Sequence, residues 1–282
     1  MNISLTNFPK VTFRANVTTD KITQNTPNST TITDQAKQDT FEKSENKPNS
    51  PKYVTTDIFY INDNHGRIGN MSRIYSAKEL YDNQTKNSTA DKLVLAAGDI
   101  SVGADPHIVK AANTYMNALG VEAISDGNHE YDATPQEIAE SKKNAKFKSL
   151  GMNLQIPQGN PLDGVIEKSF VLEKNGHKYA IIGLAPPDLH ERIRDNESRK
   201  QIGVDDFAKT IKDVQKAIDD YKQQGINKVI LLSHCGLTKD KKLATETSGI
   251  DIIIGGHTHD LITGVEEGKN LLKSKSNEPV VI

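Results

Sequence analysis

The chain has 282 residues, 26% of them charged, and its formal net charge of −2 at pH 7 gives no indication of nucleic-acid binding through bulk electrostatics. Its single cysteine, Cys235, excludes an intrachain disulfide framework. No apolar run approaches the roughly 18 residues of a membrane span, and the N-terminus lacks the apolar stretch of about 7–15 residues found in a secretory signal. Without a recognisable signal peptide, the sequence alone indicates a cytoplasmic protein.

Residues 1–52 differ in composition from the rest of the chain. Ser, Thr and Asn occupy 21 of these 52 positions, and aromatic residues are almost absent after Phe13. Such a segment buries too little apolar surface to offset the entropy lost on ordering. We therefore expect a disordered tail over 1–52 and one folded domain over 53–282. The apolar motif FPKVTFRA at 8–15 is a candidate recognition peptide, although chance is the simpler explanation.

From residue 53 onward, apolar runs typical of strands alternate with segments of helical periodicity. We expect strands within 53–61, 91–99, 121–130, 147–156, 164–186, 226–236 and 249–259, with a hairpin turn at 174–178. We expect helices over 70–84, 106–120, 134–146 and 203–225, with Thr134 as an N-cap and Gly120 and Gly225 as helix stops. The last six residues, NEPVVI, look like a strand that has barely begun, so we expect the domain to be cut short or part of a larger protein.

Polar residues of the kind that bind metals follow one predicted strand after another. They are Asp63 and His65, then Asp99, then Asn128, His129 and Glu130, and finally His234, His257 and His259. Five of the eight histidines of the chain are in this set. In open α/β sheets, ligands bind beyond the carboxyl ends of the strands, so we expect these side chains to converge on one site.

The chemistry of this set indicates two metal ions. Oxygen and nitrogen donors without a thiolate favour Mn²⁺, Fe, Zn²⁺, Co²⁺ or Mg²⁺ over the metals that prefer sulfur. Even seven donors from this set of nine exceed the need of one ion, and they suit two ions about 3.5–4 Å apart that share a carboxylate. Asp99 is the natural bridge, because each of its oxygens can bind one ion. Cys235 is expected to be a small packed residue rather than a ligand or nucleophile.

Five motifs carry a family resemblance. In chain order, INDNHGRI, LAAGDISVG, DGNHEYD, LLSHCG and IIGGHTHD resemble the motifs of the calcineurin-like metallophosphoesterases, and within that superfamily those of the bacterial 5′-nucleotidases. The resemblance covers 53–282, and the five motifs together are highly specific. It implies a four-layer αββα sandwich, in which two mixed β-sheets are flanked by helices. The predicted strands agree with that fold, but by themselves they also agree with a doubly wound sheet.

The resemblance also implies roles for the individual residues. Asp63, His65 and His259 would bind the first ion, Asn128, His234 and His257 would bind the second, and Asp99 would bridge them. His129 would face the substrate phosphate, oriented by Asp132, while a metal-activated water attacks phosphorus in line. Glu130 is expected to support the loop rather than to bind metal.

The substrate and the compartment are left open by the sequence. A nucleotide, hydrolysed as by a 5′-nucleotidase, is the first hypothesis, and a 2′,3′-cyclic nucleotide or another phosphodiester is the second. A third hypothesis is a non-catalytic metal-binding interaction module with 1–52 as its docking arm, but such a module has no need of the His129–Asp132 pair. The family implies a second, C-terminal substrate-binding domain, absent here, and often export to the periplasm or cell exterior. Asp126, where the family prefers apolar residues, is expected to perturb its loop or to face solvent.

Overall fold

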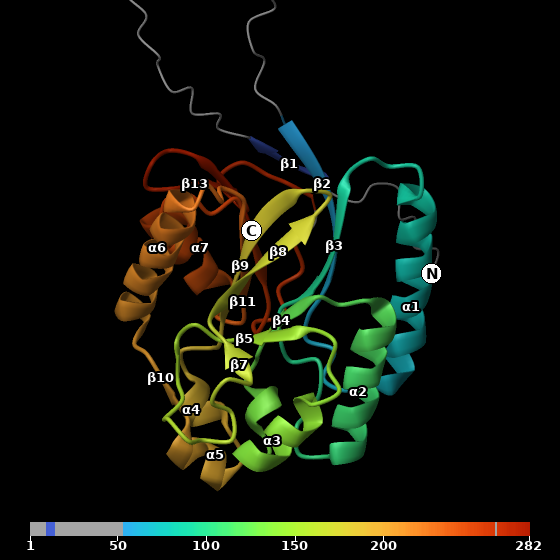
Figure 1. The fold of residues 1–282 in the computed structure, drawn as a ribbon, viewed down its shortest axis with the longest axis vertical. Helices are drawn as coiled ribbons and strands as arrows, with labels where there is room; N and C mark the ends of the chain where they lie inside the picture. The colour runs from blue at the N-terminus through green and yellow to red at the C-terminus, as the bar shows by residue number, and fades with distance from the viewer. Residues whose placement is uncertain (1–9, 15–52, 263) are drawn as a thin grey trace, which may run out of the picture.

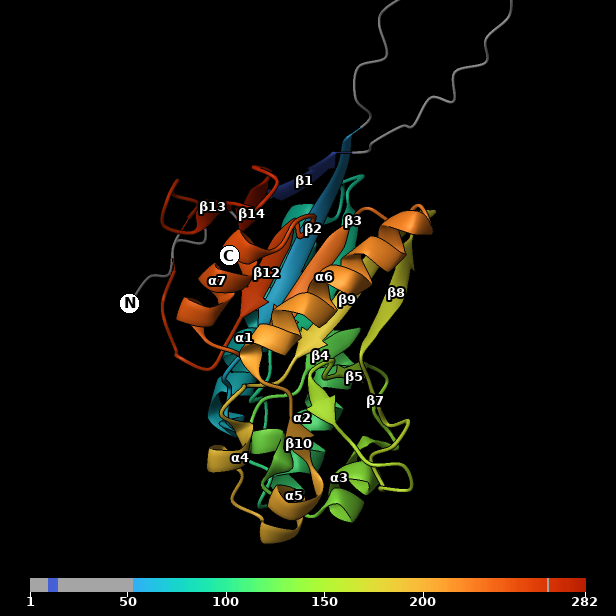
Figure 2. The ribbon, with the colours of Figure 1, turned by 90° about the vertical axis from the view of Figure 1, so that its left-hand side faces the viewer.

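Two six-stranded mixed sheets form the centre of the molecule (Figures 1 and 2). The computed structural model describes residues 10–14, 53–262 and 264–282. In spatial order, the first sheet contains β1 (Lys10–Arg14), β2 (Tyr53–Ile61), β3 (Asp91–Ala96), β4 (Ala123–Ser125), β5 (Lys148–Leu150) and β7 (Ile166–Glu167). The second contains β13 (Leu271–Lys273), β14 (Pro279–Val281), β12 (Ile252–Gly255), β11 (Val229–Ser233), β9 (His177–Leu184) and β8 (Ser169–Lys174). The central strands of both sheets are parallel, whereas β1, β8 and β13 pair antiparallel at the edges.

Helices cover the outer faces of both sheets. On the first sheet lie α1 (Ile68–Thr85) and α2 (Pro106–Leu119), and on the second lie α6 (Phe207–Gln223) and α7 (Leu237–Glu246) (Figure 1). The lower end in Figure 1 is formed by α3 (Pro135–Lys142), α4 (Leu189–Arg192), α5 (Asn196–Gln201) and the strand pair of β6 (Leu154–Gln155) and β10 (Gly203–Val204). These layers confirm the predicted αββα sandwich.

Two-residue alternation along the strands divides the apolar side chains between the layers. In β3, Leu93 and Leu95 enter the core between the sheets, whereas Ala96 packs on the side of α1 and α2. In β11, Ile230 enters the same central core and Leu231 faces α6 and α7. Both faces of the central strands are therefore buried, which explains why their sequences read as continuous apolar runs.

Most of the predicted elements are confirmed, with shifted ends. The strand expected over 147–156 is in fact two strands, β5 and β6, which belong to different sheets. The hairpin turn at 174–178 is present, and both Asn175 and Gly176 adopt positive φ. The C-terminal strand is present as β14. The sequence analysis missed α4, α5, α7 and β13, which are short or rich in polar residues.

The N-terminal segment corrects one expectation in part. Lys10–Arg14, placed by sequence within a disordered tail, pairs antiparallel with Tyr53–Asp57 as β1. Lys10–Arg14, the described part of the motif at 8–15, thus forms a strand, because the edge of β2 offers unpaired backbone groups there. The rest of 1–52 lies outside the described residues.

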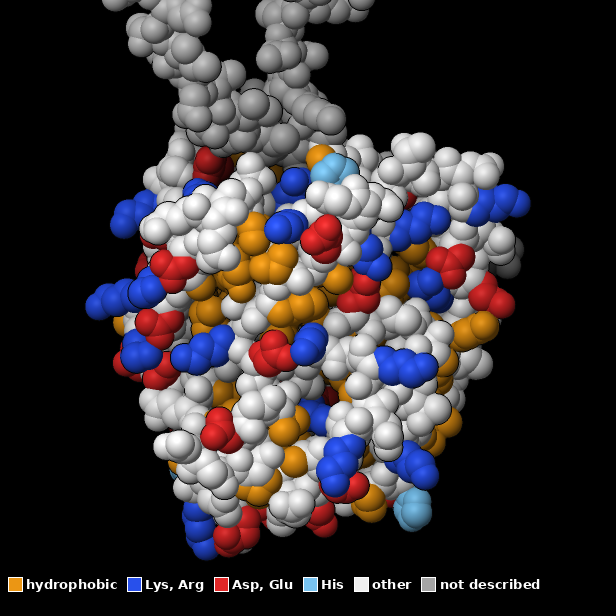
Figure 3. Space-filling view, viewed as in Figure 1, with side chains coloured by type: hydrophobic (Ala, Val, Ile, Leu, Met, Phe, Trp, Pro, Cys, Tyr) orange, Lys and Arg blue, Asp and Glu red, His pale blue; other side chains and the backbone are white. Residues whose placement is uncertain are grey.

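The surface and the helices give two further observations. On the face shown in Figure 3, Lys and Arg side chains are interspersed with Asp and Glu side chains. In the described part of the chain, none of the helices combines the length and the apolar character needed to cross a membrane.

Asp251 links the stability of the second sheet to pH. Its Oδ2 accepts a hydrogen bond from the backbone N–H of Val229 at 2.8 Å. Burial raises the pKa of this carboxyl to about 7, although the Val229 hydrogen bond favours the charged form. An aspartate in the unfolded chain ionises near pH 4. Between pH ~4 and ~7 the folded state therefore binds the extra proton, and the free energy of unfolding falls as the pH rises.

We expect Asp251→Asn to be more stable than the parent above pH 7, by about 1–3 kcal/mol, because Asn keeps an oxygen acceptor for Val229 and cannot ionise. The advantage should shrink on acidification and vanish near pH 4. Urea unfolding at pH 8, 6 and 4 measures this difference. An advantage that did not change with pH would contradict the assignment of a raised pKa to Asp251.

Candidate metal centre

Loops from both sheets meet at one end of the sandwich. The strands β2 and β3 run parallel with Ile61 opposite Ala96, and β11 and β12 run parallel with Ser233 opposite Gly255. The residues that follow these four strands therefore emerge at the same level. Two contacts join the sheets here: the carboxylate of Asp63 accepts the backbone N–H of His257 at 3.1 Å, and Nδ1 of His234 lies 2.6 Å from the carbonyl oxygen of Ala97.

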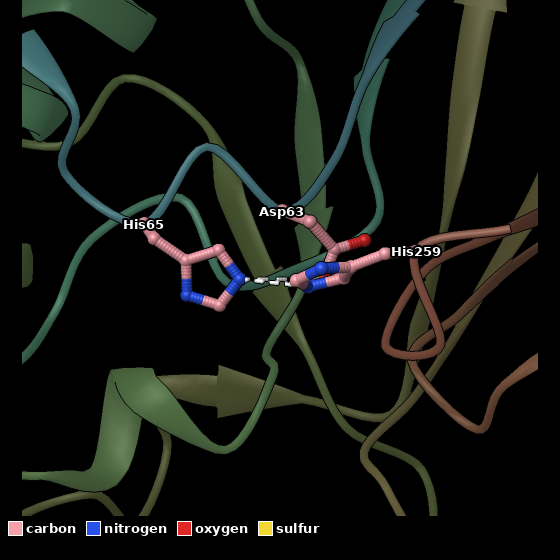
Figure 4. Close-up of side chains that lie close together, drawn as sticks. All are labelled: Asp63, His65 and His259. Carbon is pink, nitrogen blue, oxygen red and sulfur yellow. Dashed lines mark hydrogen bonds and ion pairs between the residues drawn. The ribbon is translucent and has the colours of Figure 1, made fainter. Parts of the chain in front are cut away.

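Asp63, His65 and His259 form the first cluster of donors (Figure 4). The Nε2 atoms of the two histidines are 2.9 Å apart, and Nε2 of His259 lies 3.4 Å from Oδ1 of Asp63. Nε2 of His65 lies 3.9 Å from the same oxygen. Figure 4 shows both rings and the carboxylate pointing toward one another. Nitrogen and oxygen donors at this spacing suit one small divalent ion.

Asp99, His234 and His257 form the second cluster. Nε2 of the fully buried His234 lies 3.1 Å from Oδ2 of Asp99, and the rings of His234 and His257 are 5.0 Å apart. Asp99 also faces the first cluster, because the same Oδ2 is 4.0 Å from Nε2 of His65. Asp99 thus belongs to the second cluster and also faces the first, as a carboxylate shared by two ions would.

The contacts of His234 indicate whether a cation fits beside Asp99. Its Nδ1 is matched to a carbonyl acceptor, so Nδ1 carries a proton and Nε2 is left facing Asp99. Nε2 is buried and has no hydrogen-bond partner in the described part of the chain. Burial alone would lower the pKa of His234, but Asp99 outweighs burial and raises it to about 9. His234 and Asp99 therefore need a positive charge, either between them or on His234. A metal ion can supply this charge, and so can a proton.

His129 and Asp132 lie beside the two clusters. Nδ1 of His129 is 2.6 Å from Oδ2 of Asp132, whose side chain is completely buried and also accepts the backbone N–H of Arg194. This hydrogen bond raises the pKa of His129 against the effect of burial. The His129 ring lies 5.0 Å from the His65 ring, and its nitrogen falls within 4.8 Å of donor atoms of His65 and Asp99. His129 therefore borders the centre while Asp132 fixes its ring.

Asn128 is the one predicted ligand that belongs to neither cluster. It is buried at the N-terminal end of the short 3-10 helix η1 (His129–Tyr131), directly before His129. Among the described residues, its side chain makes no hydrogen bond to another donor. Its place in the loop agrees with the predicted set, but its role as a ligand stays a prediction.

Glu130 supports the centre through the backbone, as expected from the sequence. Its Oε2 accepts the N–H groups of Asp99 and Gly127, both at 2.8 Å, and its Oε1 accepts those of Ile100 and Ser101 at 2.9 and 3.3 Å. One carboxylate thereby holds the loop after β3 against the loop after β4. Asp99 is placed by this contact.

The backbone of the centre is strained where the donors sit. Seven described residues other than glycine have positive φ, and five of them are predicted ligands: Asp63, His65, Asp99, His257 and His259. This conformation costs a non-glycine residue roughly 1–2 kcal/mol, and outside ordinary turns such residues tend to cluster at functional sites. The loops also approach closely, because a Cβ at Gly127 would lie 2.2 Å from Oδ1 of Asp99.

Other residues singled out by sequence lie elsewhere. Cys235 is buried in the core under α6 and α7, which confirms that it is a packed residue. His177, a histidine outside the five motifs, lies at the start of β9 with Nδ1 2.8 Å from Oδ2 of Asp91, away from the strand ends that carry the donors. Asp126 does not face solvent; it is buried and bonded to Lys142 and Tyr131, so its charge is compensated.

Sequence analysis missed Asp188 and Arg194, which follow β9. Oδ1 of Asp188 lies 3.4 Å from Nε2 of His257, and Nε of Arg194 lies 3.7 Å from Oδ2 of Asp132. The rule that selected the other residues, polar side chains beyond a parallel strand, also selects Asp188. Two prolines, Pro186 and Pro187, separate Asp188 from the end of the apolar run, so it does not follow the strand directly in the sequence.

An αββα sandwich with carboxylate and imidazole donors gathered at the strand ends, where they could hold metal ions, is the arrangement expected of a metal-dependent hydrolase. The chain belongs to the calcineurin-like phosphoesterase family, whose model matches residues 56–261. This confirms the family resemblance, and membership supports a metal-dependent phosphoric ester hydrolase.

Individual relatives agree with this assignment. The chain is 29% identical over 222 residues to a probable 5′-nucleotidase of Treponema pallidum, covering 73% of this chain and 37% of that protein. It is 29% identical over 232 residues to the NAD 5′-nucleotidase of Haemophilus influenzae, covering 76% and 38% of the two chains. It is 26% identical over 275 residues to the trifunctional nucleotide phosphoesterase YfkN of Bacillus subtilis, covering 84% of this chain and 18% of that protein.

Solved structures show the same fold. A 5′-nucleotidase precursor from Thermus thermophilus superposes with a TM-score of 0.67 at 24% identity, over 79% of this chain and 47% of the other. The NAD nucleotidase of Haemophilus influenzae gives 0.64 at 25% identity, over 79% and 43%. This chain therefore spans less than half the length of each of these relatives.

We expect Glu130→Gln to lower the free energy of unfolding by about 2–4 kcal/mol. The NH₂ group of Gln replaces one carboxylate oxygen and cannot accept the two backbone N–H groups that this oxygen now serves. Urea unfolding measures the loss. Glu140→Gln is the matched control, since Glu140 is an exposed acid on α3 paired with Lys143, and it should change stability by less than about 0.5 kcal/mol. Equal stability of the two variants would refute the role of Glu130.

Proposed function

We propose that this chain hydrolyses phosphate esters with the help of two divalent metal ions, and that its substrates are nucleotides. The observation that carries the proposal is the pair of three-donor clusters with Asp99 between them. Family membership supports the reaction class. The names of the relatives, several of which are 5′-nucleotidases, support the choice of nucleotides.

The residues would divide between the two ions as follows. Asp63, His65 and His259 would hold the first, Asn128, His234 and His257 the second, and Asp99 both. When bound, the ions supply Lewis acidity toward a water molecule and toward the phosphoryl oxygens. The donor set admits Mn²⁺, Zn²⁺, Fe, Co²⁺ or Mg²⁺. Metal binding requires neutral imidazoles and ionised carboxylates. Any protons on these side chains must therefore leave the centre when the ions bind.

His129 and Asp132 would form the catalytic pair. Asp132 accepts the Nδ1 proton of His129, which fixes the ring and leaves Nε2 to face the centre. The raised pKa of His129 favours the protonated ring, whose Nε2–H can donate to a phosphoryl oxygen or to the departing alkoxide. A module that only bound metal would not need this buried pair.

A groove that runs along β12 and the segment after it reaches the first cluster at His259, and this end of the groove could accommodate the organic part of a substrate. It has a volume of about 1230 Å³, and Tyr60, Asn62, His259 and Leu261 are among the residues that line it. The side chains of Tyr60 and Leu261 are 47% and 89% exposed. An exposed aromatic ring near a phosphate-processing centre supports a substrate with a planar base.

We expect the protein to hydrolyse bis(p-nitrophenyl) phosphate when Mn²⁺ is added, and to lose this activity on treatment with EDTA. Asp99→Asn should reduce turnover by at least about 100-fold, because it removes the carboxylate shared by both ions. Release of p-nitrophenol measures the rate. Full activity of Asp99→Asn, or activity that resists EDTA, would exclude a dinuclear mechanism.

The ratio of rates on AMP and on 2′,3′-cyclic AMP separates the two enzyme hypotheses. A faster reaction with AMP supports the nucleotidase assignment, and a faster reaction with the cyclic diester supports the phosphodiesterase. If neither of these substrates nor bis(p-nitrophenyl) phosphate reacts while Mn²⁺ binds, the result supports the metal-binding module.

We expect Asp132→Asn to lower kcat by about 10–100-fold while Mn²⁺ affinity stays within a factor of about two, because Asp132 acts on His129 and not on the ions. Steady-state kinetics and Mn²⁺ titration measure the two quantities. Equal losses of kcat and of Mn²⁺ affinity would instead place His129 among the ligands.

A further inference from the structure

Asp188 reaches the centre from a strand to which the motifs assign no ligand. The strand β9 lies beside β11 in parallel register, with Leu184 opposite Ser233, so its carboxyl end emerges next to His234. Two prolines, Pro186 and Pro187, follow and restrict the backbone. The next helix, α4, is anchored by the fully buried Leu189. Asp188 is thus held between a rigid turn and an anchored helix.

The two oxygens of Asp188 face different partners. Oδ2 accepts a hydrogen bond from Nε of Arg192 at 3.0 Å. Oδ1 is buried, and within the described residues it has no hydrogen-bond donor. Nε2 of His257 lies 3.4 Å from this oxygen. A buried acceptor without a donor is costly, so this oxygen is aimed at the one ring nitrogen that can serve it.

The tautomer of His257 follows from this contact. A neutral imidazole has one N–H and one lone pair, and the partner of one nitrogen decides which of them is left for a metal ion. If Nε2–H donates to Asp188, the lone pair lies on Nδ1. Histidines that bind metals commonly donate their second N–H to a carboxylate, which orients the ring and makes the ligand more basic.

We propose that Asp188 is a positioning residue for the metal centre: it accepts the Nε2 proton of His257, so that Nδ1 binds the second ion, and Arg192 holds the carboxylate in place. The inference rests on the proposed dinuclear centre, since it concerns one ligand of that centre. Asp188 does not itself touch the substrate in this scheme. Its effect is on how tightly and in which orientation His257 binds.

Titration of the metal-free protein with Mn²⁺ tests the inference through affinity rather than activity. We expect two sites in the parent, and in Asp188→Ala one of them should be weakened by about 10–100-fold while the other is unchanged. Arg192→Gln should weaken the same site to a smaller extent. Glu191→Gln is the matched control, because it removes an acidic charge from the exposed side of the same helix, and it should bind like the parent.

A second measurement identifies the nitrogen. Long-range ¹H–¹⁵N spectra of the Zn²⁺-loaded parent should show His257 protonated at Nε2 and metal-bound at Nδ1. Metal bound at Nε2, or parent-like affinity at both sites in Asp188→Ala, would overturn the positioning role while leaving the dinuclear centre intact. If the parent itself binds fewer than two Mn²⁺ ions, the proposed function fails together with the inference. Circular dichroism of Asp188→Ala and Arg192→Gln verifies that both variants are folded.

Discussion

The structure of the centre depends on two buried carboxylates, those of Asp63 and Asp99, which both lie close to the same histidines. The side chains of Asp63 and Asp99 are only 7% and 3% exposed, and both approach Nε2 of His65 and of His234. Buried negative charge is costly unless a cation is close to it. Without a metal ion, the imidazole of His234 can supply that charge, because Asp99 raises its pKa to about 9, whereas burial lowers the pKa of His65 and of His257. The folded centre is therefore most stable when a positive charge, from a metal ion or from a proton, lies beside the two carboxylates.

The same constraint explains why the centre lies at the seam of the sandwich. The carboxylates come from β2 and β3 of one sheet, and most of the imidazoles come from β11 and β12 of the other. Contacts such as Asp63 with the backbone of His257 join the two layers directly. Ions bound between the sheets would therefore stabilise the folded state in addition to serving the reaction, since they bind the folded chain and not the separated strands. Strain at the positive-φ ligands is offset by this cross-linking and by the four backbone hydrogen bonds of Glu130.

The sequence revealed the fold and most of the candidate centre because both depend on local pattern. Apolar runs marked the central strands, and polar residues after them marked Asp63, Asp99, His234 and His257. Sequence could not reveal what depends on distance in space. Nothing near Asp188 in the chain shows that it lies 3.4 Å from His257, and nothing in 1–52 shows that Lys10–Arg14 pairs with β2. The helix α7 was missed because only one side of it is buried and its composition is largely polar.

Specificity must come from residues outside the metal centre. In the proposed function the two clusters would act on a phosphoryl group, which every phosphate ester shares, so they would not distinguish a nucleotide from another ester. Contacts with the rest of the substrate raise kcat when they tighten in the transition state, and they raise only affinity when they do not. The groove beside His259, with the exposed Tyr60, is the surface of this chain that such contacts can use. The relatives it matches are more than twice as long, so the comparison of substrates measures how much recognition this part of the molecule performs alone.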